Sequence, residues 1–564
     1  MNNRKKSFVQ LLLWLGGLLL LNVFFNWLPF SPQLDVTSDK RFSLTAATKQ
    51  MVRKLNSDVS VEVYLEGEFP SGFKRLQTGI RNLLNDMRSQ SSRFRYSFID
   101  PLAGDIPTRN AAMEGFKKDK IFPINLKVKS KEGMQEKMLF PYAKVYYKGR
   151  WAIVNLLENQ VQGLSQEVIL NNSLSLVEYK IANAINKLSA TAAPLIGFIE
   201  GHGELAPIET ADLEQTLREF YSTVHINLDS ATQLKQGIGA LVIARPRTSF
   251  PLKHQFLIDQ YIMNGGKVVW CIDKLAVATD SLRRSKEFVP TDYTLDIDNL
   301  LFRYGARINP NTVMDMRCSR IPLQVGVMGN EPQYDLKPWY YHVLAFSEGN
   351  HPIVKNLDAI QLYYPSSIDT IKTKTPVTKT VVLASSDHSS MRFLPFRVSF
   401  DILRTAPDPV QFNKPKQAMA VLLEGTFPSY FENRVTPEFE AALGKTGQKF
   451  KAVSEKTKQV VIADGDICRN DVSPELNDFK PLGYNNFEKH QFANKKFMLN
   501  VIEYLLDNNG VMEARSKEVK LRLLDKPAVE ANKLLYQIVN TAAPLLLLGI
   551  FAFFFNRWRK RKYA

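Results

Sequence analysis

Cysteine is scarce in this sequence, and its scarcity argues against a disulfide-based fold and against a lipid-modified amino terminus. The 564 residues contain three cysteines, Cys271, Cys318 and Cys468, which are odd in number and far apart. Such a set builds no disulfide framework, so the protein must rely on ordinary hydrophobic cores. Because no cysteine precedes Cys271, we also expect no lipid-modified cysteine near the amino terminus.

The motifs that bind nucleotides or place catalytic groups are missing as well. There is no Gly-x-x-x-x-Gly-Lys-Ser/Thr loop and no Gly-x-Gly-x-x-Gly after a strand, so we expect the chain not to bind ATP itself. No Gly-x-Ser-x-Gly elbow, His-Glu-x-x-His or Cys-x-x-Cys occurs, and the seven histidines are scattered. We therefore predict a protein that is not an enzyme and that holds no metal or other cofactor.

Acidic residues are absent from both ends of the chain, where basic residues gather. The formal net charge is +17; residues 1–28 and 534–564 supply eight of these charges, which leaves +9 for the long middle. A middle this mildly basic lacks the concentrated stripe that nucleic acid requires, so we expect no nucleic-acid binding. The eight terminal residues are Arg4, Lys5, Lys6, Arg557, Arg559, Lys560, Arg561 and Lys562.

Two long hydrophobic runs lie just inside these basic ends. Phe8–Leu28 has 21 residues and Leu534–Phe555 has 22, and about 20 residues cross the hydrocarbon core of a bilayer as a helix. No small-x-small cleavage site follows the first run, so we interpret it as an uncleaved anchor. The positive-inside rule places both termini in the cytoplasm. We therefore predict a two-pass protein of a bacterial inner membrane, embedded in the lipid bilayer, with the bulk of the chain in the periplasm.

Two polar residues interrupt the second run. Gln537 and Asn540 lie three apart, on one face of the expected helix. Polar side chains within a span usually face a protein partner, so we expect this face to dock on a permease or on a second copy of the chain. The alternative is that Gln537 lies at the level of the headgroups, where its amide is simply hydrated.

The region between the runs contains two α/β patterns, separated by a break at Ala190–Pro194. In the first pattern, the residues of a strand, a helix and a strand follow one another as in a βαβ unit. The expected elements are strands at Val59–Leu65, Phe94–Ile99, Ile121–Val128 and Met138–Leu156, helices at Phe73–Ser89 and from Ser173 onward, and a hairpin turn at Lys148 and Gly149.

Beyond the break, short apolar strands alternate with helical patterns, which is typical of a parallel, doubly wound sheet. Strands are expected at 194–200, 222–227, 239–244, 267–272, 377–383, 417–423 and 459–463, and helices at 210–220, 256–263, 293–304 and 495–506. The predicted fold class is α/β: two transmembrane helices flank a multi-domain extracytoplasmic region with a flavodoxin-like or Rossmann-like parallel sheet.

From these patterns we expect seven segments. They are a cytoplasmic tail (1–7), a transmembrane helix (8–28), a first extracytoplasmic α/β domain (29–190), a second, Rossmann-like auxiliary domain (191–510) with an insertion near 324–352, a juxtamembrane connector (511–533), a transmembrane helix (534–555) and a basic cytoplasmic tail (556–564).

Polar residues follow three of the expected strands, at the edge where an open parallel sheet binds its ligands. We expect ligand or partner contacts from His202, Glu204, Asp273, Asp464 and Asp466. The alternatives are that the Gly-His-Gly-Glu segment is a tight turn whose polar side chains face water, and that the last two aspartates form a turn with an ion pair or chelate a cation.

A cysteine at a strand end invites a further interpretation. Cys271 ends one expected strand and His202 follows another, as a nucleophile and its base would. The neighbours of Cys271 are apolar, however, which raises the pKa of a thiol and leaves it inert. We interpret Cys271 as structural.

Six strings along the chain resemble the GldG family of gliding-motility-associated ABC transporter auxiliary proteins of Bacteroidota. They are DVTSDKRFSLT (35–45), FIEGHGE (198–204), RINPNTVMD (307–315), ADGDI (463–467), NKKFMLN (494–500) and LRLLD (521–525). The resemblance covers essentially the whole chain. It implies a GldF-type permease and a GldA-type ATPase as partners and kinship with a domain of a ciliary transport protein, and it brings no catalytic residues.

The sequence thus predicts a non-enzymatic, membrane-anchored subunit of an ABC transporter complex linked to gliding motility, with a periplasmic α/β ectodomain that contacts substrate or envelope partners. One alternative is a true solute-binding subunit with a pocket at the strand end around residues 201–204. The other is an envelope hydrolase, which requires an exposed nucleophile with a base.

Overall fold

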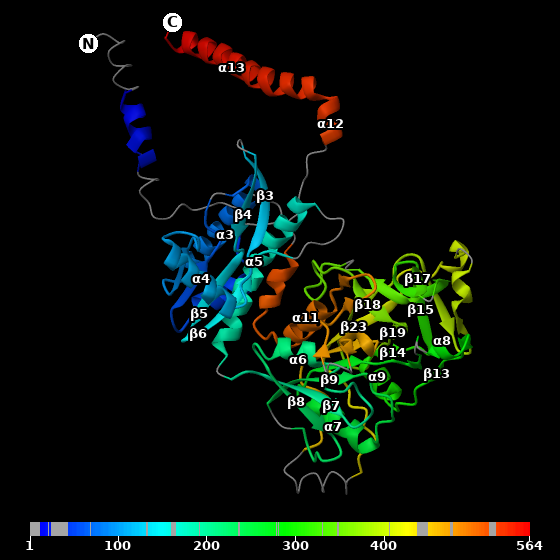
Figure 1. Ribbon diagram of the computed structural model, residues 1–564. Coiled ribbons are helices and arrows are strands. Elements are labelled where there is room, and N and C mark those ends of the chain that lie inside the picture. Colours follow the sequence, from blue (N-terminus) through cyan, green and yellow to red (C-terminus); the bar gives the residue numbers. More distant parts are fainter. Residues whose placement is uncertain are drawn as a thin grey trace. The chain divides into compact units, whose positions relative to one another are not determined.

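The computed structural model is a mixed α/β structure (Figure 1). It describes residues 12–20, 22–23, 43–67, 69–130, 133–158, 165–190, 192–234, 237–277, 279, 281–329, 331–346, 349–404, 407–436, 449–473, 478–517 and 526–563. Residues Met1–Glu518 form one compact unit and Val519–Ala564 form a second. The seven segment boundaries expected from the sequence stay predictions.

A four-stranded sheet, with order β2-β1-β5-β6, organises the first part of the larger unit. β1 and β2 are parallel and are joined by α3, which confirms the predicted βαβ unit, whereas β5 and β6 are antiparallel. The elements are α2 (Ala46–Arg53), β1 (Val59–Val63), α3 (Ser71–Gln90), β2 (Phe94–Phe98), α4 (Ile106–Lys118), β3 (Ile124–Ser130), β4 (Gly133–Leu139), β5 (Tyr142–Tyr147), β6 (Arg150–Asn155) and α5 (Gln166–Ser189).

The turn between β5 and β6 is at the predicted position. Lys148 and Gly149 have φ angles of +51° and +72°. Two positive φ angles in succession match the right-handed twist of a two-residue hairpin. The prediction of a hairpin turn at these residues is confirmed.

The start of α5 was predicted wrongly. The helix begins at Gln166, where the Ser165 side chain accepts a hydrogen bond from the Val168 N–H. Ser173, the expected first residue, lies inside the helix, and its hydroxyl donates to the Ile169 carbonyl at 2.7 Å. A serine inside a helix can donate its hydroxyl to the carbonyl of the preceding turn, whereas a serine at a helix start caps the first N–H groups. The sequence around Ser173 does not distinguish these two roles.

A seven-stranded sheet organises the rest of the larger unit, in the order β20-β23-β24-β10-β9-β7-β8. β8, β7, β9, β10 and β24 are all parallel, and their order is the 2-1-3-4-5 order of a flavodoxin-like sheet. Its strands are β7 (Leu195–Glu200), β8 (Ser222–Asn227), β9 (Ile238–Ala244), β10 (Val268–Cys271), β20 (Val377–Ala384), β23 (Ala418–Gly425) and β24 (Thr457–Ile462).

The sheet is mixed, which corrects the expectation of a parallel one. β23 runs antiparallel to β24, and β20 runs antiparallel to β23. Both added strands lie at one end of the sheet, so the five-stranded parallel part keeps its flavodoxin-like order.

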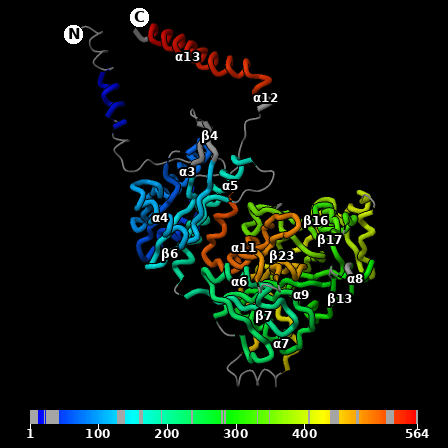
Figure 2. Tube along the Cα trace, in the orientation of Figure 1, coloured from blue at the N-terminus to red at the C-terminus, as the bar shows by residue number. Residues whose placement is uncertain are grey.

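Each central strand sends alternate side chains into two separate cores, because successive side chains point to opposite faces of a sheet. Val242 and Cys271 belong to the core that also contains residues of α6 (Ala211–Leu217) and α11 (Asn494–Leu506). Ile243 and Trp270 belong to the core under α7 (Leu252–Met263) and α9 (Asp298–Tyr304). Helices thus cover both faces, as in a doubly wound sheet, and Figure 2 shows α11 beside α6.

A three-stranded antiparallel sheet covers part of the larger sheet's carboxyl edge. It consists of β16 (Cys318–Met328), β17 (Glu331–Ala345) and β18 (Ile360–Tyr363). The segment 324–352, which was expected to be an insertion, contains the tip of the β16–β17 hairpin and the whole of β17. The Tyr363 N–H donates to Asp464 Oδ2 at 2.9 Å, which fixes β18 beside the end of β24.

Short elements complete the larger unit. They are β11 (Leu275–Ala276), α8 (Ser281–Arg284), β12 (Glu287–Phe288), β13 (Thr291–Asp292), β14 (Ala306–Ile308), β15 (Asn311–Asp315), β19 (Ile368–Thr370), β21 (Ser389–Phe393), β22 (Val398–Ser399), β25 (Val472–Ser473), β26 (Asp478–Phe479), β27 (Tyr484–Asn485), β28 (His490–Gln491) and the 3-10 helices Phe400–Leu403, Pro409–Gln411, Asp466–Cys468 and Val511–Ser516.

The smaller unit consists of α12 (Lys526–Ala531) and α13 (Lys533–Tyr563). Among the described residues, Lys533–Arg561 is the one helix long and apolar enough to cross a membrane. It contains an 18-residue stretch whose mean hydropathy is 2.2 and of which no part is buried. It contains the predicted second span. Of the predicted first span, residues 12–20, 22 and 23 are described, and all are helical; the remainder, with Arg4, Lys5 and Lys6, lies outside the described residues.

Candidate functional site

The candidate site lies where parallel strands β7, β9, β10 and β24 end side by side. An open α/β sheet binds its ligands beyond the carboxyl ends of its strands, because side chains from several loops converge there. The residues that follow these strands include His202, Arg245, Asp273 and Asp464. The fold therefore brings together the strand ends that the sequence singled out.

The Gly201–Glu204 segment is a turn whose polar side chains face inward. His202 and Glu204 are 2% and 3% exposed. His202 Nδ1 lies 2.9 Å from Glu204 Oε1, and the imidazole ring stacks on Phe250 with 3.7 Å between the centroids. Gly201 and Gly203 have φ angles of +114° and +73°, a conformation that favours glycine. The turn interpretation is confirmed in its backbone, but the expectation that these side chains face water is wrong.

The hydrogen bonds of His202 explain why it points inward. Its Nε2 lies 2.9 Å from Nδ1 of His254, at the start of α7, and its carbonyl accepts the N–H groups of Arg247 and Thr248 at 2.7 and 2.9 Å. Burial lowers the pKa of His254, with His202 contributing in the same direction. The turn therefore ties β7 to the loop after β9, and neither ring nitrogen of His202 is free to bind a ligand.

The three expected aspartates do come together, around an arginine that sequence reasoning missed. Arg245, directly after β9, places Nε 3.0 Å from Asp273 Oδ2 and Nη1 2.8 Å from Asp466 Oδ1. Asp273 also accepts the Gly465 N–H at 2.6 Å, and Asp464 accepts the N–H groups of Asp466 and Tyr363. The turn-with-ion-pair interpretation of Asp466 matches this geometry. Among the described residues no group of three or more His, Cys, Asp or Glu side chains is arranged to hold a metal ion.

Burial governs the protonation of this acidic cluster. Burial and, second, the neighbouring Asp466 raise the pKa of Asp273 to about 6. Burial also raises the pKa of the fully buried Asp464 well above its ordinary value, with Asp273 and Asp466 adding to the effect. Carboxylates this close cannot all ionise freely in a low-dielectric site, so Asp464 favours its neutral form.

A cavity of about 220 Å³ lies over this cluster. Its lining combines three arginines, five aromatic or imidazole rings and several amides from elements far apart in the sequence. These residues are Arg245, Val277, Thr279, Arg320, Ile321, His342, Gln361, Tyr363, Tyr364, Asp466, Arg469, Asp471, Tyr484, Asn485, Asn486 and Phe487. Of the five site residues expected from the sequence, Asp466 lines the cavity, whereas Asp273 and Asp464 lie in the ion-paired cluster beneath it.

Most of the cavity residues that the sequence analysis did not predict could not have been found from local sequence patterns. Arg245 follows the buried strand β9, and the strand-end rule applied to every strand would have pointed to it. Arg320 and Tyr363 lie on β16 and β18 and reach the cavity because the three-stranded sheet lies over the edge. No local pattern marks them.

Two cysteines are also neighbours in space. Cys271 Sγ and Cys468 Sγ lie 3.4 Å apart, and both residues are fully buried. Burial, reinforced by Cys468, raises the pKa of Cys271 well above its ordinary value. Both nitrogens of His202 are engaged elsewhere, so these two residues do not form the nucleophile–base pair that an envelope hydrolase would need. Cys271 matches the structural interpretation.

A protein-family model matches residues 193–501, the region that contains the seven-stranded sheet and the cavity. Its description is "ABC-type uncharacterized transport system". The match covers more than half of the chain. The chain belongs to this family. Its description names a transport system and no reaction, and membership implies partnership with an ABC transporter complex. A second model, for a domain of unknown function, matches residues 38–146.

Other similarities are more distant. An uncharacterized protein of Borreliella burgdorferi is 19% identical over 527 residues, which cover 92% of this chain and 90% of that protein. The solved mmIFT52 N-terminal domain matches with a TM-score of 0.29 and 12% identity, over 55% of this chain and 96% of that structure. The solved structure of a ThuA-like protein from Parabacteroides merdae matches with a TM-score of 0.26 and 9% identity, over 59% of this chain and 94% of that structure. At these TM-scores neither structural likeness bears on function.

Proposed function

We propose that this chain is a non-enzymatic subunit of an ABC transporter complex, anchored in the bacterial inner membrane and of the GldG type that is linked to gliding motility. Membership of the family supports the association with an ABC transport system. The anchor rests on α13, which contains an 18-residue stretch with a mean hydropathy of 2.2 and no buried part. A soluble protein would not leave so long an apolar helix uncovered.

The proposed topology is two-pass, with both termini in the cytoplasm and residues 29–533 in the periplasm. Its support is the distribution of charge. Arg557, Arg559, Lys560 and Arg561 gather at the end of α13, and Arg4, Lys5 and Lys6 precede the first hydrophobic run. Basic residues next to a span are retained on the cytoplasmic side.

The proposed partners are a GldF-type permease in the membrane and a GldA-type ATPase in the cytoplasm. The chain itself has no phosphate-binding loop in its sequence, so the energy of transport must come from another subunit. The folded region would then act as a periplasmic extension that contacts substrate or envelope partners.

A true solute-binding subunit is the second candidate, and the cavity favours it. The pocket expected at residues 201–204 is filled by the buried His202 and Glu204. The cavity over the Arg245–Asp466 pair lies at the same sheet edge and takes the place of that pocket in this hypothesis.

Two measurements test the proposal. Alkaline phosphatase inserted after Asn509 should be active, as this enzyme is in the periplasm, whereas the same enzyme fused after Ala564 should be inactive. Affinity purification of the full chain from native membranes in mild detergent should recover a permease and an ATPase. An active carboxyl-terminal fusion, or recovery of the chain without any transporter subunit, would contradict the proposal.

A further inference from the structure

We propose that the cavity at the carboxyl edge of the seven-stranded sheet binds a small organic anion, or the anionic end of a larger molecule, through a single carboxylate or phosphate group. The inference deepens the proposed function and rests on it, since it names the chemistry of what the folded region contacts.

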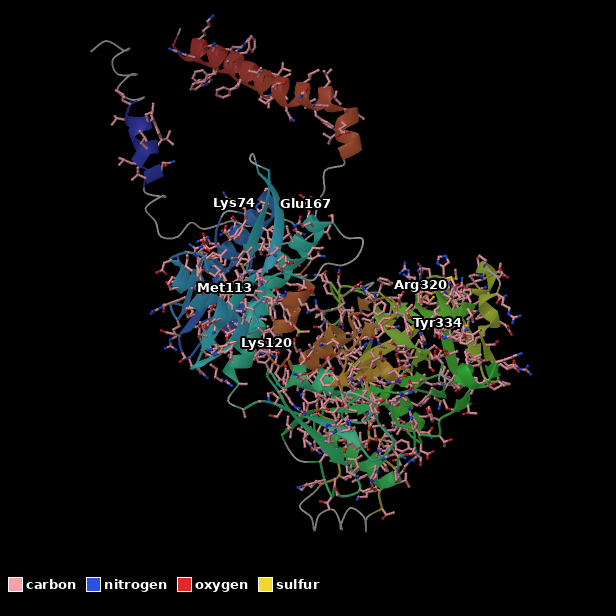
Figure 3. The ribbon with its side chains drawn as sticks, viewed as in Figure 1. Lys74, Met113, Lys120, Glu167, Arg320 and Tyr334 are labelled. Carbon is pink, nitrogen blue, oxygen red and sulfur yellow. The ribbon has the colours of Figure 1, made fainter. Side chains whose placement is uncertain are left out.

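Three arginines reach the cavity, and they differ in their partners. Arg245 forms ion pairs with Asp273 and Asp466. Arg469 places Nη1 2.9 Å from Asp466 Oδ1 and Nε 3.5 Å from Glu209 Oε1. Arg320 is exposed on β16 (Figure 3) and forms no ion pair within the part of the chain that the structure describes. A guanidinium without a carboxylate is the group that pairs with a carboxylate or phosphate, and its planar fork accommodates two of the oxygens.

Tyr363 supplies a neutral donor on a fixed backbone. Its N–H donates to Asp464, and no hydrogen bond from its hydroxyl is found among the described residues. Burial and, second, Asp471 raise the pKa of Tyr363, so its hydroxyl stays protonated at any physiological pH. Together with Arg320 it presents donors, which match the oxygens of an anion.

Several other polar groups of the lining are already engaged with one another. Tyr364 and His342 both contact Thr279, and burial lowers the pKa of His342 to about 3, so this ring is neutral. Asn486 donates to Asp471 at 3.0 Å. These bonds hold the walls in place without a ligand, which is how binding sites reduce the entropy cost of association.

Charge and size limit the ligand to one anionic group. Asp466 and Asp471 offset two of the three arginine charges in the lining, so one negative group is matched and a second would be repelled. The volume of about 220 Å³ is smaller than a pocket for a drug-sized molecule. Ile321 and the half-exposed ring of Phe487 offer an apolar surface for the body of the ligand.

The test uses the full chain purified in detergent and isothermal titration with named anions. One arm contains inorganic phosphate and glycerol 3-phosphate, and the other contains acetate and N-acetylglycine. Glycerol and N-acetylglycinamide are the neutral counterparts, and chloride matches the ionic strength. The variants are Arg320→Met and Tyr363→Phe, and the control is Arg307→Met, an exposed arginine on β14 that does not line the cavity.

We expect saturable binding in at least one arm, and the arm that binds identifies the group. Arg320→Met should raise the Kd about tenfold or more, since bonds to charged groups are the strong ones, Tyr363→Phe should raise it less, and Arg307→Met should leave it unchanged. Binding that is no tighter than that of the neutral counterparts, or that is unaffected by Arg320→Met, overturns the inference. Recovery of transporter subunits by the Arg320→Met chain tests the proposed function separately, because subunit assembly does not require the cavity.

Discussion

Two carboxylates that lie largely inside the protein, Glu158 and Glu178, are matched by cations from distant parts of the chain. Glu158 Oε1 lies 2.6 Å from Lys180 on α5, and its Oε2 lies 3.0 Å from Lys496 on α11. Glu178 of α5 accepts the Thr45 N–H at 2.7 Å and pairs with Lys517 at 2.9 Å. Removing one member of such a group leaves the others buried without a partner, which costs more than the intact group contributes.

Glu158 therefore makes stability depend on pH in a defined window. Burial opposes its ionisation, but Lys180 and Lys496 outweigh burial and lower its pKa to about 2. A carboxylate whose folded pKa is depressed contributes stability above its unfolded value near 4.5, and this contribution is lost as the pH falls towards 2. Glu158→Gln should lower the free energy of unfolding by about 2 kcal/mol at pH 7 and by progressively less below pH 4.5.

Urea unfolding of the detergent-purified chain at pH 7 and pH 3 measures this effect. Glu219→Gln, which changes an exposed glutamate, is the matched control and should shift the midpoint at neither pH. Equal destabilisation by Glu158→Gln at the two pH values would mean that the charge of Glu158 is not the cause.

At the scale of elements, α13 has two unlike faces. Gln537 and Asn540 share one face with Pro544, and Pro544 has no N–H to bond the carbonyl of Asn540. In a bilayer an unbonded carbonyl and a side-chain amide both require a partner, because lipid supplies none. The opposite face is a groove lined by Ala542, Gly549, Phe553 and other small or apolar residues.

We predict that Asn540→Leu weakens assembly with the permease or with a second copy of the chain. Hydrogen bonds within membranes contribute only about 0.6–2 kcal/mol, so co-purification should fall several-fold without being abolished. Phe553→Leu, on the opposite face, is the control. If Asn540→Leu assembles as well as the wild type in both mild and stringent detergent, the hypothesis that Asn540 faces a partner is wrong.

For the whole molecule, we predict that the purified chain neither binds nor hydrolyses ATP. Its sequence contains no phosphate-binding loop, and its family is described as part of a transport system. Equilibrium dialysis with labelled ATP should show no saturable binding, and the assembled complex should lose ATPase activity when the partner ATPase is inactivated. Saturable binding by the isolated chain would contradict this prediction.

The sequence by itself determined most of the elements of the larger sheet. β9 and β10 were predicted within one residue of their bounds, because strands buried on both faces are continuous apolar runs between polar turns. β8, an edge strand with no buried residue, was also predicted at its observed bounds. The sequence did not determine the direction of β23, since an apolar run has the same composition in a parallel and an antiparallel strand. Only the partner across the ladder decides between the two.

The candidate site divides in the same way. The sequence placed Asp273, Asp464 and Asp466 at one edge, because the carboxyl ends of neighbouring parallel strands must meet there. Tertiary structure decided which side chains are free to act. It buried His202 against Phe250 and His254, paired Asp466 with Arg245, and brought Arg320 and Tyr363 over the edge from a separate sheet. Burial and pairing depend on residues tens to hundreds of positions away, so no local pattern could contain them.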